Sequence, residues 1–213
     1  MNYLSYDNIV FLLKRGIVPR KHEHMLSIEY AYENGLYLGC PGKDLFYSLP
    51  MFSNEQIDSL IPLIAALFPA DPPSRSVDYS VFWRYFFGVF DKRGLLNSTG
   101  SESTKKISDK WQIYFNIVDR LLKYYKTVNK KHFGIVVLSE MTAHRYGDIA
   151  SLSKNTDNYN SYRDRMIKWY TNTHDLAVEI KARKNAFSSL YWCSFYLLSM
   201  GEIDLFNNFA TKF

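Results

Sequence analysis

The sequence holds only two cysteines, Cys40 and Cys193, among its 213 residues. Disulfide frameworks and structural zinc sites need cysteines at short, repeated spacings, so neither is expected, and the pair suits a reducing cytoplasm. No apolar run approaches the roughly 18 residues that a membrane span requires. The first residues also lack a basic stretch ahead of an apolar core, as a signal peptide would have. We therefore expect a soluble, cytoplasmic protein with no membrane contact.

Short motifs of the common enzyme and cofactor sites are absent as well. The chain has no P-loop, no Gly-x-Gly-x-x-Gly and no Gly-x-Ser-x-Gly. His22 and His24 are two residues apart, and helical positions at that spacing do not share a face. The other three histidines, His132, His144 and His174, stand on separate segments. We expect no catalytic site, no metal and no cofactor.

What the sequence does contain is apolar and aromatic residues in helical spacing. Apolar residues make up 47% of the chain and aromatic residues 17%, which is enough for one well-packed core. Apolar positions recur every three or four residues over most of the chain, and Ser53 with Gln56 forms a capping box ahead of one such segment. The prediction is a mainly α, compact bundle of about seven or eight helices, with residues 1–213 as a single domain. A polar stretch at 95–107 is the predicted hinge loop.

Two segments allow either a strand or a helix. Residues 25–40 alternate apolar and polar positions around Asn34-Gly35, which fits a short β-hairpin or a helix with an Asn-Gly C-cap. Residues 133–141 are short and apolar, and their periodicity does not separate the two structures. Five aromatic side chains on strongly apolar helices are expected to be buried: Phe82, Phe86, Trp111, Tyr191 and Trp192.

Glu179-x-Lys181 has the spacing of the last motif of restriction-endonuclease-like nucleases. On a strand, positions i and i+2 share a face, so the carboxylate could bind Mg²⁺ while the lysine orients a water. Asp148 is the candidate second carboxylate. The residues from Leu176 to Lys184 are also good helix formers, and on one helix Glu179 and Arg183 would form an i, i+4 pair. We favour the helix and keep the metal-dependent nuclease as an alternative.

A second basic run lies at the end of a predicted long helix. Arg120, Lys123, Lys126, Lys130 and Lys131 alternate with Tyr124 and Tyr125. Such a surface can bind nucleic acid, with the cations on phosphates and the tyrosines stacked on bases. It can equally be the end of a helix whose cations complement the helix dipole and whose tyrosines face the core. The net charge of +5 permits an anionic partner without requiring one.

The C-terminal part resembles the PoNi-type helical immunity proteins of polymorphic toxins. The resemblance rests on Trp169-Tyr170, on Tyr191-Trp192 and on Ile203-Asp204 near the end of the chain, with Leu190 where that pattern has glycine. It implies an all-α protein that binds and blocks a toxin.

The function predicted from the sequence is that of a non-enzymatic cytoplasmic protein that binds and neutralises another macromolecule, first of all a toxin protein. Nucleic-acid binding is the alternative beside the nuclease. The residues expected to contact the partner are exposed charges from two segments. They are Lys123, Lys126, Lys130, Lys131, Glu179, Lys181, Arg183 and Lys184.

Overall fold

The computed structural model describes residues 6–14, 48–66, 68–72 and 94–211. The helices of these residues are α1 (Tyr6–Lys14), α4 (Asn54–Ala65), α6 (Asp109–Val128), α7 (Phe133–Leu152), α8 (Tyr159–Glu179), α9 (Arg183–Met200) and α10 (Ile203–Ala210). Two short 3₁₀ turns, Leu49–Met51 and Glu102–Thr104, complete the set. No strand occurs within the described residues, so the all-α class is confirmed. The candidate hairpin at 25–40 lies outside these residues. The predicted number of about seven or eight helices refers to the whole chain, part of which also lies outside them.

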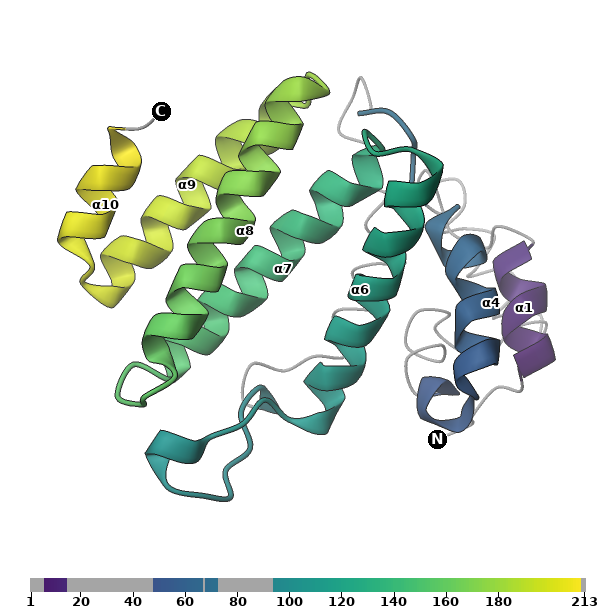
Figure 1. Cartoon of the computed structure of the whole chain (residues 1–213), viewed down its shortest axis with the longest axis horizontal. Coiled ribbons are helices and arrows are strands. Elements are labelled where there is room, and N and C mark those ends of the chain that lie inside the picture. Colours follow the sequence, from purple (N-terminus) through teal and green to yellow (C-terminus); the bar gives the residue numbers. More distant parts are fainter. Residues whose placement is uncertain (1–5, 15–47, 67, 73–93, 212–213) are drawn as a thin grey trace, which may run out of the picture.

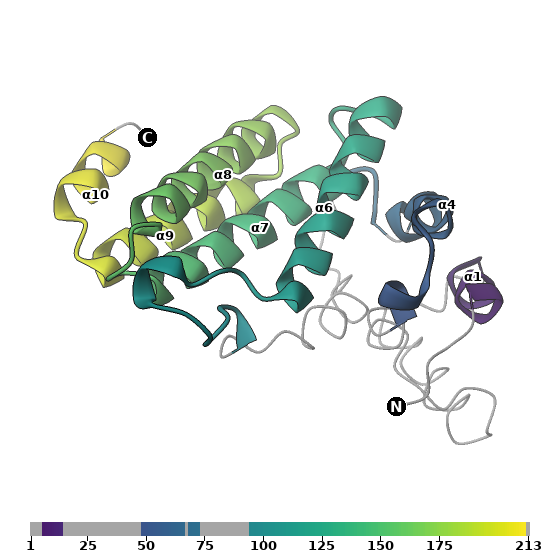
Figure 2. The ribbon, with the colours of Figure 1, turned by 60° about the horizontal axis from the view of Figure 1, so that its bottom comes forward.

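The helices follow one another across the molecule in chain order. Figure 1 shows α1 and α4 at one side, α6 and α7 in the middle, and α8, α9 and α10 at the other side. Figure 2 gives the same order from a second direction. Because the connections after α6, α7, α8 and α9 are short, successive helices run antiparallel. The connections between these helices therefore lie alternately at the two opposite ends of the bundle.

The core is continuous along this row of helices. One cluster of buried apolar side chains joins α1, α4, α6 and α7, and a second joins α7 to α8, α9 and α10. Trp111 is fully buried, as predicted, while Phe82 and Phe86 lie outside the described residues. The prediction for Tyr191 is wrong, because its side chain is 54% exposed. Trp192 is half-buried and packs against the second cluster.

The ambiguous segment 133–141 is the first half of α7. This helix is covered by α6, α8 and α9, so its residues from Phe133 to Ser139 are all buried. A helix that is apolar nearly all round has no amphipathic period, which is why the pattern alone did not separate helix from strand. The prediction at Ser53 is confirmed: Gln56 N–H donates to its hydroxyl and Ser53 N–H donates to the Gln56 side chain, which together close the capping box.

The two ends of the predicted loop at 95–107 lie side by side. Leu96 and Ile107 form an isolated antiparallel bridge, and Asn97 N–H donates to the Lys106 carbonyl over 2.8 Å. Ser108 N–H closes the loop by donating to the Leu95 carbonyl. The segment therefore enters α6 in a fixed direction.

Candidate functional site

Two basic segments that are distant in the sequence meet at one end of the bundle. This end, at the top of Figure 1, gathers the last turns of α6 and α8 and the first turns of α7 and α9. An ion pair of 2.7 Å between Lys131 Nζ and Glu179 Oε1 joins the two connections. We call this surface the basic end. Its exposed cations are Lys126, Lys130, Lys131, Lys181, Arg183 and Lys184.

The chain between α8 and α9 reverses at Lys181, which has a φ of 61°. Ala182 N–H donates to the Ala177 carbonyl over 2.7 Å, and Lys181 N–H donates to the Val178 carbonyl over 3.1 Å. This pair of hydrogen bonds is a Schellman motif, with Lys181 at the left-handed position where glycine is preferred. Because α8 ends at Glu179 and α9 begins at Arg183, the predicted helical pair between these two residues is wrong.

The first turn of α9 is also built against local preference. Its N-cap is Ala182, which makes no side-chain capping bond, and no acidic residue stands in the first turn. Arg183 and Lys184 occupy that turn, where the positive end of the helix dipole disfavours cations. The start of α4 shows the opposite arrangement, with Ser53 as a capping residue and Glu55 in the first turn. Local stability therefore does not explain the residue types at 181–184.

Glu140 of α7 fixes the start of α9 from beneath. Its carboxylate accepts hydrogen bonds from Asn185 Nδ2 at 2.8 Å and from Ser188 Oγ at 2.5 Å. Burial raises the pKa of Glu140 above its usual range, while these two donors and the charge of Lys184 oppose that shift. The contact orients the first turn of α9 and with it the cations at the basic end.

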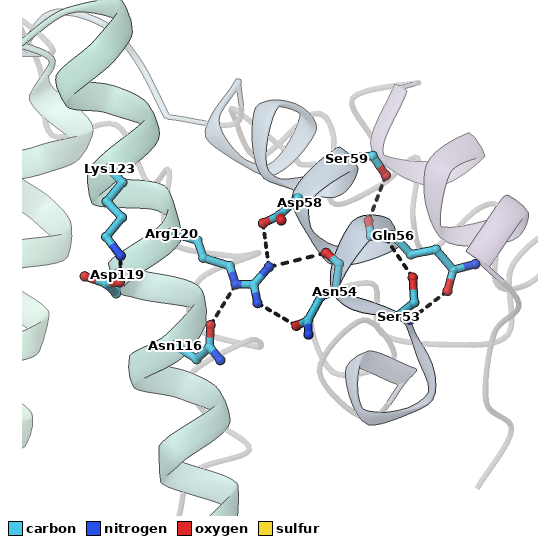
Figure 3. Close-up of polar contacts among 9 residues, drawn as sticks. All are labelled: Ser53, Asn54, Gln56, Asp58, Ser59, Asn116, Asp119, Arg120 and Lys123. Carbon is cyan, nitrogen blue, oxygen red and sulfur yellow. Dashed lines mark hydrogen bonds and ion pairs between the residues drawn. The ribbon is translucent and has the colours of Figure 1, made fainter.

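In the earlier part of the basic run, the side chains of Arg120, Lys123 and Tyr125 make contacts within the protein. Arg120 reaches from α6 to the first turns of α4, where its guanidinium binds Asp58 and donates to Asn54 Oδ1 over 2.7 Å (Figure 3). Lys123 Nζ pairs with Asp119 on its own helix at 2.7 Å. Tyr125 is buried and donates to the Ala65 carbonyl over 2.6 Å. The interpretation of Tyr125 as a base-stacking residue is therefore wrong, and Arg120 is not available to a phosphate.

The three residues of the nuclease hypothesis are not brought together. Asp148 is buried in the last turns of α7, where it accepts from Tyr196 Oη at 2.8 Å and pairs with Arg145 at 3.0 Å. Glu179 lies at the opposite end of the bundle, beside the start of α7. Some fifteen residues of α7 separate the two positions, which at 1.5 Å per residue is roughly 20 Å. A single Mg²⁺ cannot bridge carboxylates that far apart, and the strand that the nuclease alternative requires at 176–184 is helix and turn instead.

A buried polar network between α7, α8 and α9 was not foreseen from the sequence. His144 Nδ1 and Tyr170 Oη are 3.0 Å apart, and the imidazole lies edge-on to Trp192. Burial raises the pKa of Tyr170 far above its usual range and that of the Cys193 thiol to about 12. Groups held neutral in this way do not act as nucleophiles at neutral pH. The network fixes the packing of three helices, and no sequence motif marks it because its members come from separate helices.

No group of three or more metal-binding side chains occurs in the part of the chain that the structure describes. Among the same residues, no helix has the length and apolarity needed to cross a bilayer.

Comparison with known proteins identifies no relative. No family model matches the chain, and no curated protein or solved structure is detectably similar to it. The resemblance of residues 169–204 to immunity proteins thus rests only on the spacing of Trp169-Tyr170, Tyr191-Trp192 and Ile203-Asp204.

Proposed function

We propose that this protein is a non-enzymatic cytoplasmic inhibitor that binds an acidic face of another protein through the basic end, and that this partner is a toxin. The observation that carries the proposal is the set of cations at 181–184. A left-handed lysine and two cations at a helix N-terminus each oppose local stability. Residues that break local rules without a compensating contact are often retained for binding or catalysis.

Convergence of the two segments supports a macromolecular partner. The cations of the α6–α7 connection lie beside those of the α8–α9 connection, so a wide positive surface results from segments about fifty residues apart. Two helix N-termini, of α7 and α9, and two helix C-termini, of α6 and α8, meet at this surface, so their dipoles largely cancel and the exposed cations set its positive charge. Such a field speeds association with an acidic partner and makes it sensitive to salt.

The resemblance to immunity proteins selects a toxin among acidic protein partners. The nuclease alternative loses its support because its residues do not converge. Nucleic-acid binding loses one of its two stacking tyrosines, since Tyr125 is buried. Binding in place of chemistry also agrees with the buried, neutral state of the Tyr170 and Cys193 side chains.

Co-expression with any growth-inhibiting protein that a neighbouring gene encodes tests the proposal. The variant Lys130→Glu/Arg183→Glu should no longer rescue growth, and its association rate with the purified toxin should fall at least about tenfold at low salt. The matched control Lys106→Glu/Lys168→Glu makes the same change in net charge at exposed positions elsewhere and should retain rescue. Because Arg183→Glu removes a cation from a helix N-terminus, loss of binding would not result from a weakened fold.

Two results would overturn the proposal. One is growth rescue by the Lys130→Glu/Arg183→Glu variant at the wild-type level. The other is tight, salt-dependent binding to a single-stranded DNA or RNA oligonucleotide without binding to the toxin. Cleavage of such an oligonucleotide in Mg²⁺ that Glu179→Ala abolishes would instead establish the nuclease.

A further inference from the structure

The outer face of α9 is apolar along its whole length. Four large side chains on it are exposed: Phe187 by 72%, Tyr191 by 54%, Phe195 by 49% and Leu198 by 46%. Their spacing of four, four and three residues places them on one face of the helix. The opposite face holds buried residues such as Cys193 and Leu197. We call these four residues the α9 stripe.

No charged residue stands between Lys184 and Glu202, so α9 is apolar on its outer face as well as its inner one. A helix that is apolar all round is normally covered on every side. The neighbouring helices α7, α8 and α10 pack against α9, while the four side chains of the stripe remain exposed. Contiguous exposed aromatics of this kind are typical of protein interfaces, where they supply most of the binding energy.

The charges at the two ends of the stripe are of opposite sign. Arg183 and Lys184 precede it, whereas Asp204 follows it; Glu202, also on that side, is already paired with Arg163 of α8 at 3.1 Å. Asp204 is exposed in the first turn of α10. A surface that is apolar in the middle, positive at one end and negative at the other is complementary to itself when turned end for end. Two-fold dimer interfaces have this property, because the same patch is used by both copies.

We propose that the α9 stripe binds the α9 stripe of a second copy of this chain, antiparallel and about a two-fold axis between Tyr191 and Phe195. In this register Tyr191 lies opposite Phe195 of the second copy. The same register places Arg183 near the exposed Asp204 of the second copy. A parallel arrangement would place like charges together at both ends, so the charge pattern selects the antiparallel one.

The dimer does not rest on the proposed function, although the two surfaces share Arg183. The dimer interface is centred on the middle of α9, whereas the basic end is centred on the connections between helices. The cations of the α6–α7 connection stay open in the dimer. Failure of either test therefore leaves the other proposal standing.

Sedimentation velocity over a range of concentrations tests the dimer. The wild-type protein should sediment as a dimer, and Tyr191→Lys should be a folded monomer because each lysine would lie against Phe195 of the second copy and place a charge in the apolar interface. The control Leu152→Lys introduces the same charge at an apolar side chain that is 50% exposed on α7, and it should remain dimeric. A wild-type protein that is monomeric at every concentration overturns the proposal, as does a dimer that survives Tyr191→Lys.

Charge reversal tests the register. Arg183→Asp alone and Asp204→Arg alone should each weaken the dimer at least about tenfold, since each creates like-charge contacts twice across the axis. An equimolar mixture of the two variants should form a mixed dimer, in which every such contact again joins opposite charges. A dimer in which the mixture is no tighter than either variant would refute the antiparallel register.

Discussion

Replacing Gly147 with alanine should destabilise the protein, although the same change usually stabilises a helix. Gly147 lies inside α7, where alanine is favoured over glycine by about 1 kcal/mol. A Cβ at this position, however, would lie 2.8 Å from three ring carbons of Tyr196 on α9. Carbon atoms in good contact are about 3.5–4.0 Å apart, so the ring or the helix would have to move.

Tyr196 cannot move without loss. Its hydroxyl donates to Asp148 Oδ1 over 2.8 Å and lies 3.3 Å from the His144 carbonyl. Forcing an extra methyl into a well-packed site costs about 1–3 kcal/mol. Subtracting the gain of about 1 kcal/mol in helix propensity leaves an expected net loss of up to about 2 kcal/mol in the free energy of unfolding.

A double-mutant cycle followed by urea denaturation isolates the cause. In the Tyr196→Phe background the ring remains, so Gly147→Ala should still destabilise. In the Tyr196→Leu background the ring is gone, and the same change should stabilise by about 1 kcal/mol. If Gly147→Ala stabilises the otherwise unchanged protein, the close approach of α7 and α9 is not as the structure has it, and the argument fails.

Three further predictions concern single side chains. His132 is the N-cap of α7: its ring stacks on Tyr125, and its Nδ1 accepts a hydrogen bond from Gly134 N–H. Burial lowers the pKa of this imidazole below 6.5. The stability that the neutral imidazole contributes is therefore present above pH 6.5 and is lost as the pH falls from there through the lowered pKa. His132→Asn retains an acceptor that does not titrate, and its melting temperature should fall less steeply between pH 7 and pH 5 than that of the wild type; an identical slope would contradict this. Arg120→Ala should lower the free energy of unfolding by about 1–3 kcal/mol because it removes the polar contacts between α6 and α4. Lys123→Ala breaks only an exposed ion pair and should change the free energy of unfolding by less than about 1 kcal/mol. Equal losses for the two variants in urea titrations would refute the distinction. Lys181→Gly should raise the melting temperature by relieving a left-handed lysine, with a gain of about 1 kcal/mol, and yet weaken toxin binding; a loss of stability would show that the lysine is held by contacts.

The turn at 180–182 shows where sequence patterns failed. Leu176 to Lys184 contains good helix formers, and no glycine, asparagine or proline marks a break. The same motif ends α9, where Gly201 takes the left-handed position and Glu202 N–H donates to the Leu197 carbonyl. There a glycine in the sequence marks the end of the helix. The difference between the two sites is a single residue type, so a break without glycine could not be detected.

Burial around α9 shows a second limit. Helical spacing predicted this helix correctly, but a helix with apolar residues on every face does not indicate which face is covered. Tyr191 and Trp192 are about 100° apart on the helix, and one is exposed while the other packs against His144. Trp111 was predicted correctly because α6 carries charges on its outer face and apolar residues on its inner one.

The candidate site was predictable as residues but not as a surface. The exposed lysines of the α6–α7 connection and those at 181–184 were identified separately, and only the antiparallel packing of α7 and α8 brings them together. Arg120 carries the same positive charge and lies in the same run, yet its side chain binds Asp58 and Asn54 of α4. Sequence spacing gives the face of a helix, and the neighbouring helix decides whether that face is free.

Arg183 belongs to both proposed surfaces, and this links them. It stands at the edge of the basic end and at the positive end of the α9 stripe. One guanidinium cannot pair with Asp204 of a second copy and with an acidic toxin face at the same time. By linkage, each binding event then weakens the other by the same free energy. Toxin bound at Arg183 should shift the dimer toward monomer, whereas toxin that binds only the α6–α7 cations should leave the dimer intact. Sedimentation of the mixture therefore shows whether α9 takes part in toxin binding.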